Sequence, residues 1–157
     1  MEYSLDPELN EFRAEVRKMA EGNFAAKAAH WDETETFPEE NRLKLGELGY
    51  LGLSIPEEYG GSGASFMHAL IAVEEIARVC PNTAVISQLY FNNAAVHIAA
   101  LGTEAQKKKF LPKATTGEYF INITITEPHA GSGMTDMKTT ATIEGDEVVL
   151  NGSKCYF

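Results

Sequence analysis

The hydrophobic pattern of this chain changes its period once, near residue 118. Before that point apolar residues recur every three or four positions, as they do from Leu9 to Met19, which is the spacing of an amphipathic helix. After it, from Ile121 to Thr126, apolar and polar residues alternate as they do in a strand. The sequence therefore predicts a mainly α protein with a short β part (α+β): a helical bundle at 1–118, then the first strands of an antiparallel β-domain at 119–157.

The helical part carries recognisable end signals. Asp6 and Pro7 form an N-cap followed by proline at the first helical position. Thr103 and Gln106 have the spacing of a capping box, which opens another helix. In order, the expected helices run from Asp6 to about Ala29, from Phe37 to Gly49, from Ser65 to Cys80, from Thr83 to Leu101, and from Thr103 to Pro112, where proline limits the last one.

The β part shows strand and turn signals in succession. The expected strands are Ile121–Thr126, Thr139–Ile143, Glu147–Leu150 and Ser153–Phe157. Pro128 ends the first because it cannot donate to a ladder, while Gly145–Asp146 joins the middle two and Asn151–Gly152 is a type I′ hairpin signal. A sheet of so few strands leaves backbone N–H and C=O groups unpaired at its edges. We therefore expect the chain to be the front part of a longer protein or to need a partner that completes its sheet.

Charge and cysteine usage exclude several classes of protein. The net charge is −10 and no basic stripe appears, which argues against nucleic acid and against an anionic membrane surface. No run approaches the roughly 18 apolar residues that a spanning helix needs. Cys80 and Cys155 lie outside any C-x-x-C motif and fit a reducing compartment, so a cytoplasmic protein is expected. The histidines lack the spacing of a metal site, and no metal is predicted.

The passage from the first strand into its loop is the main candidate site. One strand face carries Asn122, Thr124 and Thr126. The following Ala130–Gly133 consists of small residues whose backbone amides can approach an anion closely. This arrangement suits a flat polar ring with a phosphate beside it, and it is equally typical of a plain connection between a strand and a loop.

Glu74 and Glu75 form a second candidate, because paired carboxylates can perform acid–base chemistry. On a helix such a pair is usually exposed or salt-bridged, so we predict a structural role for both residues.

Several motifs, in order, resemble the flavoprotein acyl-CoA dehydrogenases. Thr126–Ser132 reads T-E-P-H-A-G-S, where that family typically has T-E-P-x-A-G-S-D. Leu150–Lys154 reads L-N-G-S-K, where the family continues L-N-G-x-K-x-W-I-T. Pro56–Gly63 and Gly102–Pro112 are similar to two further family segments, so the resemblance spans almost the whole chain.

The resemblance implies an FAD enzyme of fatty acid metabolism that removes an α-proton and a β-hydride from an acyl-CoA substrate. It also implies an electron-transfer flavoprotein as electron acceptor and a homo-oligomer, usually a tetramer. By position, the implied cofactor contacts are Ile123, Ile125 and Thr126 at the polar edge of the flavin, Ser132 beside the pyrophosphate and the substrate's pantetheine arm, and Tyr156 beside the ring. The family's catalytic carboxylate lies in a later helical domain, so no catalytic residue is assigned.

The resemblance also places the apolar helix Thr83–Leu101 along the acyl pocket. The polar residues expected to be buried in it, as core groups or as pocket-shaping ones, are Gln88, Asn92, Asn93 and His97.

The chain departs from the family pattern at three quoted positions: Gly133 replaces an aspartate, His129 stands where glycine or asparagine is common, and Tyr156 replaces a tryptophan. Acyl-CoA oxidases, desulfinases and flavin monooxygenases share this scaffold, so these reactions stay open as alternatives. A non-catalytic helical binding module or subunit is a further alternative.

Overall fold

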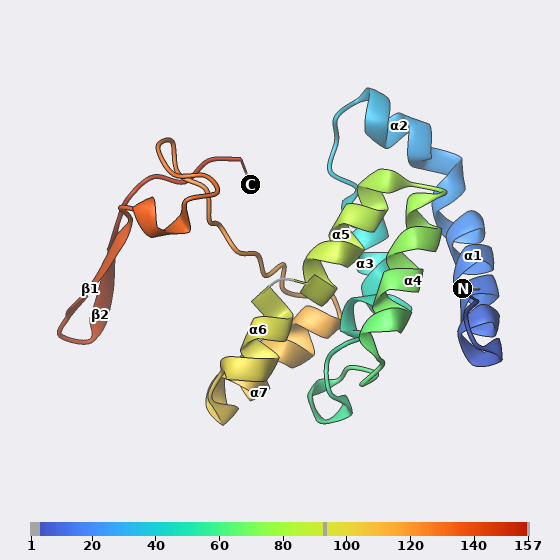
Figure 1. The fold of residues 1–157 in the computed structure, drawn as a ribbon, viewed down its shortest axis with the longest axis horizontal. Helices are drawn as coiled ribbons and strands as arrows, with labels where there is room; N and C mark the ends of the chain where they lie inside the picture. Colours follow the sequence, from blue (N-terminus) through green and yellow to red (C-terminus); the bar gives the residue numbers. More distant parts are fainter. Residues whose placement is uncertain (1–3, 93, 157) are drawn as a thin grey trace. The chain divides into compact units, whose positions relative to one another are not determined.

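The computed structural model describes residues 4–92 and 94–156. It divides into two compact units, Met1–Asn122 and Ile123–Phe157, which we call the helical unit and the β unit (Figure 1). The sequence prediction placed this division at residue 118, before the segment 119–122, which the structure groups with the helical unit. The prediction of a mainly helical chain with a short antiparallel β part is confirmed.

The helices of the helical unit follow one another with short connections. They are α1 Pro7–Phe24, α2 Ala28–Glu33, α3 Glu39–Glu47, α4 Phe66–Ala77, α5 Pro81–Asn92, α6 Ala94–Leu101 and α7 Glu104–Thr115, with 3₁₀ turns η1 Ala25–Lys27, η2 Tyr50–Gly52 and η3 Glu57–Tyr59. The first predicted helix is thus interrupted at η1, and the buried Phe24 and Trp31 lie on either side of that break. The helix predicted over Thr83–Leu101 is described as α5 and α6, on either side of residue 93, which lies outside the described residues.

The predicted caps are confirmed by their hydrogen bonds. The Asp6 carboxylate accepts from the Leu9 amide at 2.8 Å. The Thr103 hydroxyl accepts from the Gln106 amide at 3.3 Å, and the Gln106 side chain accepts from the Thr103 amide at 2.8 Å, which completes the capping box. Gly49 has φ of 82° just after α3, a left-handed conformation that favours glycine.

The expected end of the last helix at Pro112 is wrong, because α7 continues to Thr115. Pro112 lies in the final turn, where it removes the one amide that would donate to the Lys108 carbonyl, and the helix ends three residues later. The carbonyl of Pro112 accepts from the hydroxyls of Thr115 at 3.0 Å and Thr116 at 3.3 Å. Side chains thus provide the donors that the helix end lacks.

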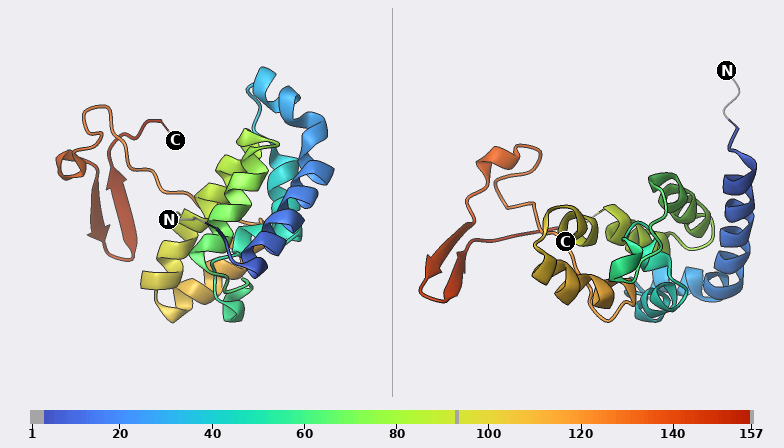
Figure 2. Two further views of the ribbon diagram at one scale, coloured as in Figure 1. Left: turned by 45° about the vertical axis from the view of Figure 1, so that its right-hand side comes forward. Right: turned by 90° about the horizontal axis from the view of Figure 1, so that it is seen from below.

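The hydrophobic core lies in the helical unit, where α4 packs against both α1 and α5 (Figures 1 and 2). Val16 of α1, Ile76 of α4 and Ile86 of α5 are at most 1% exposed. Each such side chain contributes on the order of 1.5–3 kcal/mol by leaving water. Among the described residues no helix is both long and apolar enough to cross a membrane.

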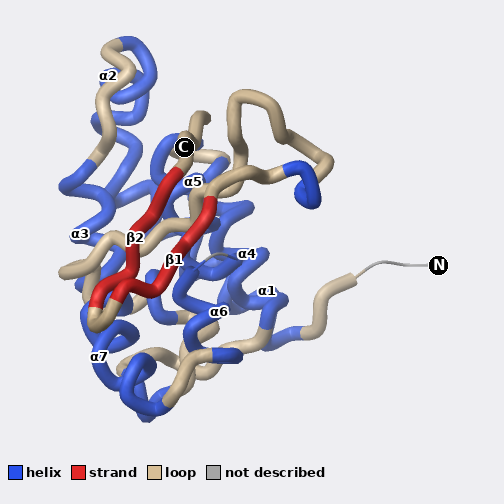
Figure 3. The backbone as a smooth tube through the Cα atoms, turned by 90° about the vertical axis from the view of Figure 1, so that its left-hand side faces the viewer, coloured by secondary structure: helices blue, strands red, loops and turns tan. Residues whose placement is uncertain are grey.

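The β unit contains one hairpin and the loops that precede and follow it (Figure 3). β1 Thr140–Glu144 pairs antiparallel with β2 Glu147–Asn151, and Gly145, at φ of 66°, allows the tight turn between them. This pair confirms the two predicted central strands. The register sets Ala141 opposite Leu150 and Ile143 opposite Val148, so these four side chains share one face of the hairpin.

Two other predicted strands are wrong. Residues 121–126 are not paired in a sheet, and neither are residues 152–156, while Phe157 lies outside the described residues. The predicted hairpin at Asn151–Gly152 is absent, because the described residues after β2 do not pair with it; there Cys155 donates its amide to the Thr126 carbonyl at 3.0 Å instead. An alternating pattern makes a segment suited to a sheet, but only a neighbouring strand makes it part of one.

Candidate functional site

The buried carboxylate of Glu127 organises the β unit. Glu127 is 3% exposed, and its two oxygens accept hydrogen bonds from three donors in two other segments. The amide of Lys138 donates to Oε2 at 2.7 Å, and the amide of Thr139 donates to Oε1 at 3.0 Å. The Lys154 ammonium donates to Oε1 at 2.9 Å. Glu127 therefore ties the T-E-P turn to the start of β1 and to the segment that follows β2.

These donors favour the charged form of Glu127. The hydrogen bond from the Lys138 amide, followed by those from Thr139 and Lys154, holds the pKa of the Glu127 carboxyl far below its usual value. The Nε2 atom of His129 lies 3.2 Å from Glu127 Oε2, and the His129 side chain is 42% exposed. His129 therefore contacts the carboxylate of its own turn, which supplies a structural reason for a histidine at this position.

Glu127 also fixes the small-residue loop. Its amide donates to the Ala130 carbonyl at 3.0 Å, and the Ala130 amide donates back at 3.1 Å, which closes a tight turn over Pro128 and His129. Ala130 is 4% exposed, whereas Ser132 is exposed. A Cβ atom added at Gly131 would meet no heavy atom within 4 Å, so the loop presents its backbone to open space there.

Local packing does not require the departure at Gly133, because only the end of an exposed, flexible side chain lies close to it. A Cβ atom at this position would lie 2.7 Å from Asp136 Oδ2, closer than a real Cβ approaches another atom. The Asp136 side chain in η4 (Met134–Asp136) thus occupies the space beside residue 133. An aspartate at 133 would displace it.

The residues predicted to contact a cofactor fall into two groups. Ile125 and Thr126 lie against the segment after β2: the Ile125 carbonyl accepts from Lys154 Nζ at 2.9 Å, and the Thr126 carbonyl accepts from the Cys155 amide at 3.0 Å. Ile123 and Thr126 are half-buried. Ser132 stands apart on the exposed loop, and Tyr156 is 94% exposed with φ of 60°.

Thr126 and Ser132 carry the polar groups of the candidate site that are left over for a ligand. The amide and hydroxyl of Thr126 and the hydroxyl of Ser132 make no hydrogen bond to another described residue. Thr126 directly precedes Glu127, whose turn is held by its hydrogen bonds, and Ser132 follows Gly131 in the exposed loop. Donors without protein partners beside a loop of small residues are what a polar ring and an anion require. No group of His, Cys, Asp or Glu among the described residues has the arrangement of a metal site.

The sequence prediction missed the roles of Glu127 and Lys154. Both stand inside the quoted motifs, as the second residue of T-E-P and the lysine of L-N-G-S-K. Their charges could have indicated these roles. Glu127 and Lys154 carry opposite charges, and Glu127 lies between apolar and turn residues, where an unpaired carboxylate would be costly.

Glu74 and Glu75 behave as predicted. Glu75 is 1% exposed, and Arg17 donates to both of its carboxylate oxygens, at 2.8 and 3.0 Å. These bonds lower the pKa of Glu75. Glu74 is exposed and pairs with Arg13 at 3.0 Å. The paired carboxylates therefore connect α4 to α1.

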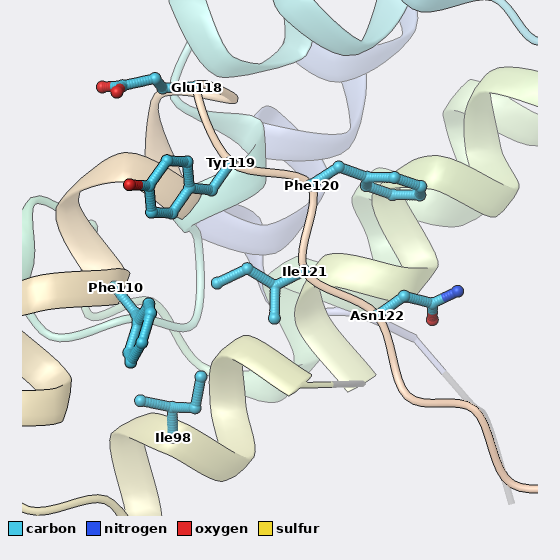
Figure 4. A pocket seen from close by; sticks show the side chains of 7 residues that line it. All are labelled: Ile98, Phe110, Glu118, Tyr119, Phe120, Ile121 and Asn122. Atoms are coloured by element: carbon cyan, nitrogen blue, oxygen red, sulfur yellow. The ribbon is translucent and has the colours of Figure 1, made fainter. Parts of the chain in front are cut away.

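The helical unit also contains an open pocket with a volume of about 530 Å³ (Figure 4). Its walls are Ile98 of α6, Phe110 of α7 and the segment that follows α7, Glu118, Tyr119, Phe120, Ile121 and Asn122. Figure 4 shows the side chains of Ile98, Phe110 and Ile121 converging on it. The lining is mixed: Ile98, Phe110 and Ile121 contribute apolar surface, and Glu118 and Asn122 contribute polar groups. A pocket of this kind can hold a ligand with both an apolar and a polar part.

The polar residues predicted to be buried in Thr83–Leu101 differ in their exposure. Gln88 is half-buried, whereas His97 is exposed, so its expected burial is wrong. His97 borders a smaller pocket of about 350 Å³ together with Phe66 and Phe91. Asn93 and the Asn92 side chain lie outside the described residues.

A family model described as "Acyl-CoA dehydrogenase, N-terminal domain" matches residues 6–118. The chain therefore belongs to the acyl-CoA dehydrogenase family, as its motifs indicate.

Relatives in sequence and structure agree with this assignment. The chain is 40% identical over 156 residues to the short-chain specific acyl-CoA dehydrogenase of Clostridium acetobutylicum, covering 99% of this chain and 41% of that protein. The crystal structure of an acyl-CoA dehydrogenase from Geobacillus kaustophilus matches with a TM-score of 0.89 and 35% identity, over 98% of this chain and 40% of that one. A structure described as the electron transferring flavoprotein of Acidaminococcus fermentans matches with a TM-score of 0.90 and 32% identity, again over 98% and 40%. The chain thus spans about two fifths of the length of these relatives.

Proposed function

We propose that this chain is the N-terminal part of an FAD-dependent acyl-CoA dehydrogenase, which forms an α,β double bond in an acyl-CoA thioester. FAD, when bound, supplies the acceptor for the β-hydride at flavin N5. The observation that carries the proposal is the set of donors of Thr126 and Ser132 that have no partner among the described residues, on either side of the turn that Glu127 fixes. Preorganised donors of this kind bind a polar ligand without reorganising the protein.

Each predicted contact has a role in this proposal. The backbone of Ile123 and Ile125 and the amide and hydroxyl of Thr126 hold the polar edge of the flavin. The Ser132 hydroxyl binds near the pyrophosphate and the substrate's pantetheine arm, where its exposure makes it accessible. Tyr156 lies beside the ring, and its 94% exposed side chain leaves a face available for stacking.

The acyl chain of the substrate is assigned to the pocket lined by Ile98, Phe110 and Ile121. Its apolar walls favour a hydrocarbon chain, since each buried CH₂ group contributes about 0.8 kcal/mol. The catalytic base is not assigned to any residue of this chain.

Electron acceptor, assembly and location complete the proposal. We infer that an electron-transfer flavoprotein accepts the electrons, that the protein forms a homo-oligomer such as a tetramer, and that it acts in cytoplasmic fatty acid metabolism. The match to a structure described as an electron transferring flavoprotein supports the choice of acceptor.

Flavin titration of the protein, expressed with its complete reading frame, tests the proposal. The wild type should bind FAD, and Thr126→Val combined with Ser132→Ala should weaken binding about 10- to 100-fold, because two hydrogen bonds of roughly 1 kcal/mol or more each are lost. Thr142→Val is the matched control, since Thr142 is an exposed threonine of β1 that lies outside the candidate site. A wild-type protein without FAD affinity, or equal losses in both variants, would contradict the proposal. Reduction of bound FAD by acyl-CoA that continues with a dye acceptor, without oxygen, separates a dehydrogenase from an oxidase.

A further inference from the structure

We propose that Lys154 is a positioning residue for the flavin: its ammonium group fixes and polarises the Ile125–Thr126 peptide, whose N–H serves as a donor to the cofactor. This inference rests on the proposed function. The inference goes beyond the proposed function because Lys154 is not among the cofactor contacts that the family resemblance implies.

The ammonium group of Lys154 is held in one orientation. Its nitrogen lies 2.9 Å from the Ile125 carbonyl oxygen, 2.9 Å from Glu127 Oε1 and 3.6 Å from the Met137 sulfur. An ammonium group has three donors, so each of its hydrogens has an acceptor. The Lys154 side chain is 20% exposed, which limits the competition from water for these acceptors.

The bond to Ile125 acts on Thr126 through the shared peptide group. A trans peptide directs its C=O and N–H in opposite directions, so an ammonium group on the Ile125 carbonyl leaves the Thr126 N–H facing away from Lys154. That N–H makes no hydrogen bond to another described residue. Hydrogen bonds in series polarise one another, so the charged donor on the carbonyl makes the Thr126 amide a stronger donor.

A second contact prevents the peptide from turning. The next residue, Cys155, donates its amide to the Thr126 carbonyl at 3.0 Å. Lys154 and Cys155 thus hold two successive carbonyls of the Ile125–Thr126 segment. Glu127 balances the lysine charge and orients it, so the group is fixed without leaving an unpaired buried charge.

A donor of this strength should favour the reduced cofactor, on which negative charge develops. The protein is expressed with its complete reading frame, loaded with FAD, and titrated potentiometrically. Lys154→Met should lower the affinity for reduced relative to oxidised FAD by about tenfold, which is about 30 mV toward more negative potential for a two-electron couple. Lys138→Met is the matched control: it removes an equal charge from an exposed side chain of the same unit and keeps the backbone amide that Glu127 uses.

A measurement without cofactor tests the same peptide directly. In the flavin-free protein, the Thr126 amide proton resonance should move upfield in Lys154→Met and stay in place in Lys138→Met. Potentials and Thr126 resonances that are equal in the two variants would overturn the inference.

Two further variants cover the case in which Lys154→Met fails to fold or to bind FAD. Lys154→Arg keeps the charge and should keep the wild-type potential, whereas Lys154→Gln keeps a neutral donor and should shift it in the negative direction. If both retain the wild-type potential, the lysine charge has no such role. A wild-type protein that binds no FAD overturns the proposed function itself, and this inference with it.

Discussion

Among the described residues, two carboxylates are almost completely buried, and different donors satisfy each of them. Glu127 relies chiefly on backbone amides, whereas Glu75 relies on arginine side chains, with Arg17 in a two-point contact and Arg13 and Arg78 at 3.5 and 3.6 Å. A buried carboxylate is tolerated only when charged or strongly polar donors surround it. Both residues therefore serve as structural connectors between segments distant in sequence.

Replacing Glu75 should therefore cost much more than replacing its neighbour. Glu75→Gln is expected to lower the free energy of unfolding by about 2 kcal/mol, because it weakens charge-assisted hydrogen bonds in a buried site. Glu74→Gln, whose side chain is 58% exposed, should change it by less than about 1 kcal/mol. Urea denaturation of both variants checks this expectation. Equal effects would show that burial of Glu75 does not matter.

Alanine should have opposite effects on stability at two glycines. A Cβ atom at Gly61 would lie 1.9 Å from the Ile55 carbonyl oxygen, so Gly61→Ala forces the backbone apart and should cost about 1–3 kcal/mol. Gly22 lies inside α1 with nothing within 4 Å of such an atom, so Gly22→Ala should stabilise the helix by about 0.5–1 kcal/mol. Thermal unfolding of the two variants should shift in opposite directions; a shift of the same sign would contradict the described packing.

At the scale of elements, we expect the stability of the loops of the β unit to depend on pH through the Glu127 carboxylate. Its pKa is lowered in the folded state, so its contribution is present above the ordinary value of 4.5 and is lost as the pH falls from there toward the folded pKa. The amides of Lys138 and Thr139, which donate to this carboxylate, should lose protection from hydrogen exchange over that range. Glu127→Gln should remove this pH dependence. Protection that falls equally in the variant would assign the effect to another group.

The elements also show where sequence reasoning succeeds. The starts of α1 and α7 were predicted because a cap is local: Asp6 and Thr103 bond to amides three residues away. The hairpin was predicted because its turn is local too. The strands expected over 121–126 and 153–157 were wrong because pairing depends on a partner that no local pattern specifies.

In the candidate site, too, local features were predicted and long-range contacts were not. The motifs identified Thr126 and Ser132 as residues to consider, and the structure leaves their hydroxyl groups unpartnered among the described residues. The hydrogen bond from Lys154 to the Ile125 carbonyl joins positions 29 residues apart, a contact that periodicity and spacing do not encode.

At the scale of the whole molecule, the two units differ in how much core they possess. Among the described residues, the buried hydrophobic side chains lie in the helical unit, apart from Ala130 in the β unit. Limited trypsin digestion should therefore cut first in the β unit, at exposed Lys138, before sites in α3 such as Lys44. Mass spectrometry of early fragments identifies the order. Early cleavage inside α3 would contradict it.

The hairpin face formed by Ala141, Ile143, Val148 and Leu150 has a consequence for sequence variation. Ile143, Val148 and Leu150 are 79%, 62% and 70% exposed within this chain. If this face is exposed to solvent in the cell, selection does not favour hydrophobic residues at these positions, and a saturation library should accept lysine at each of them. Intolerance of lysine there would reveal that something else covers the face in the living organism.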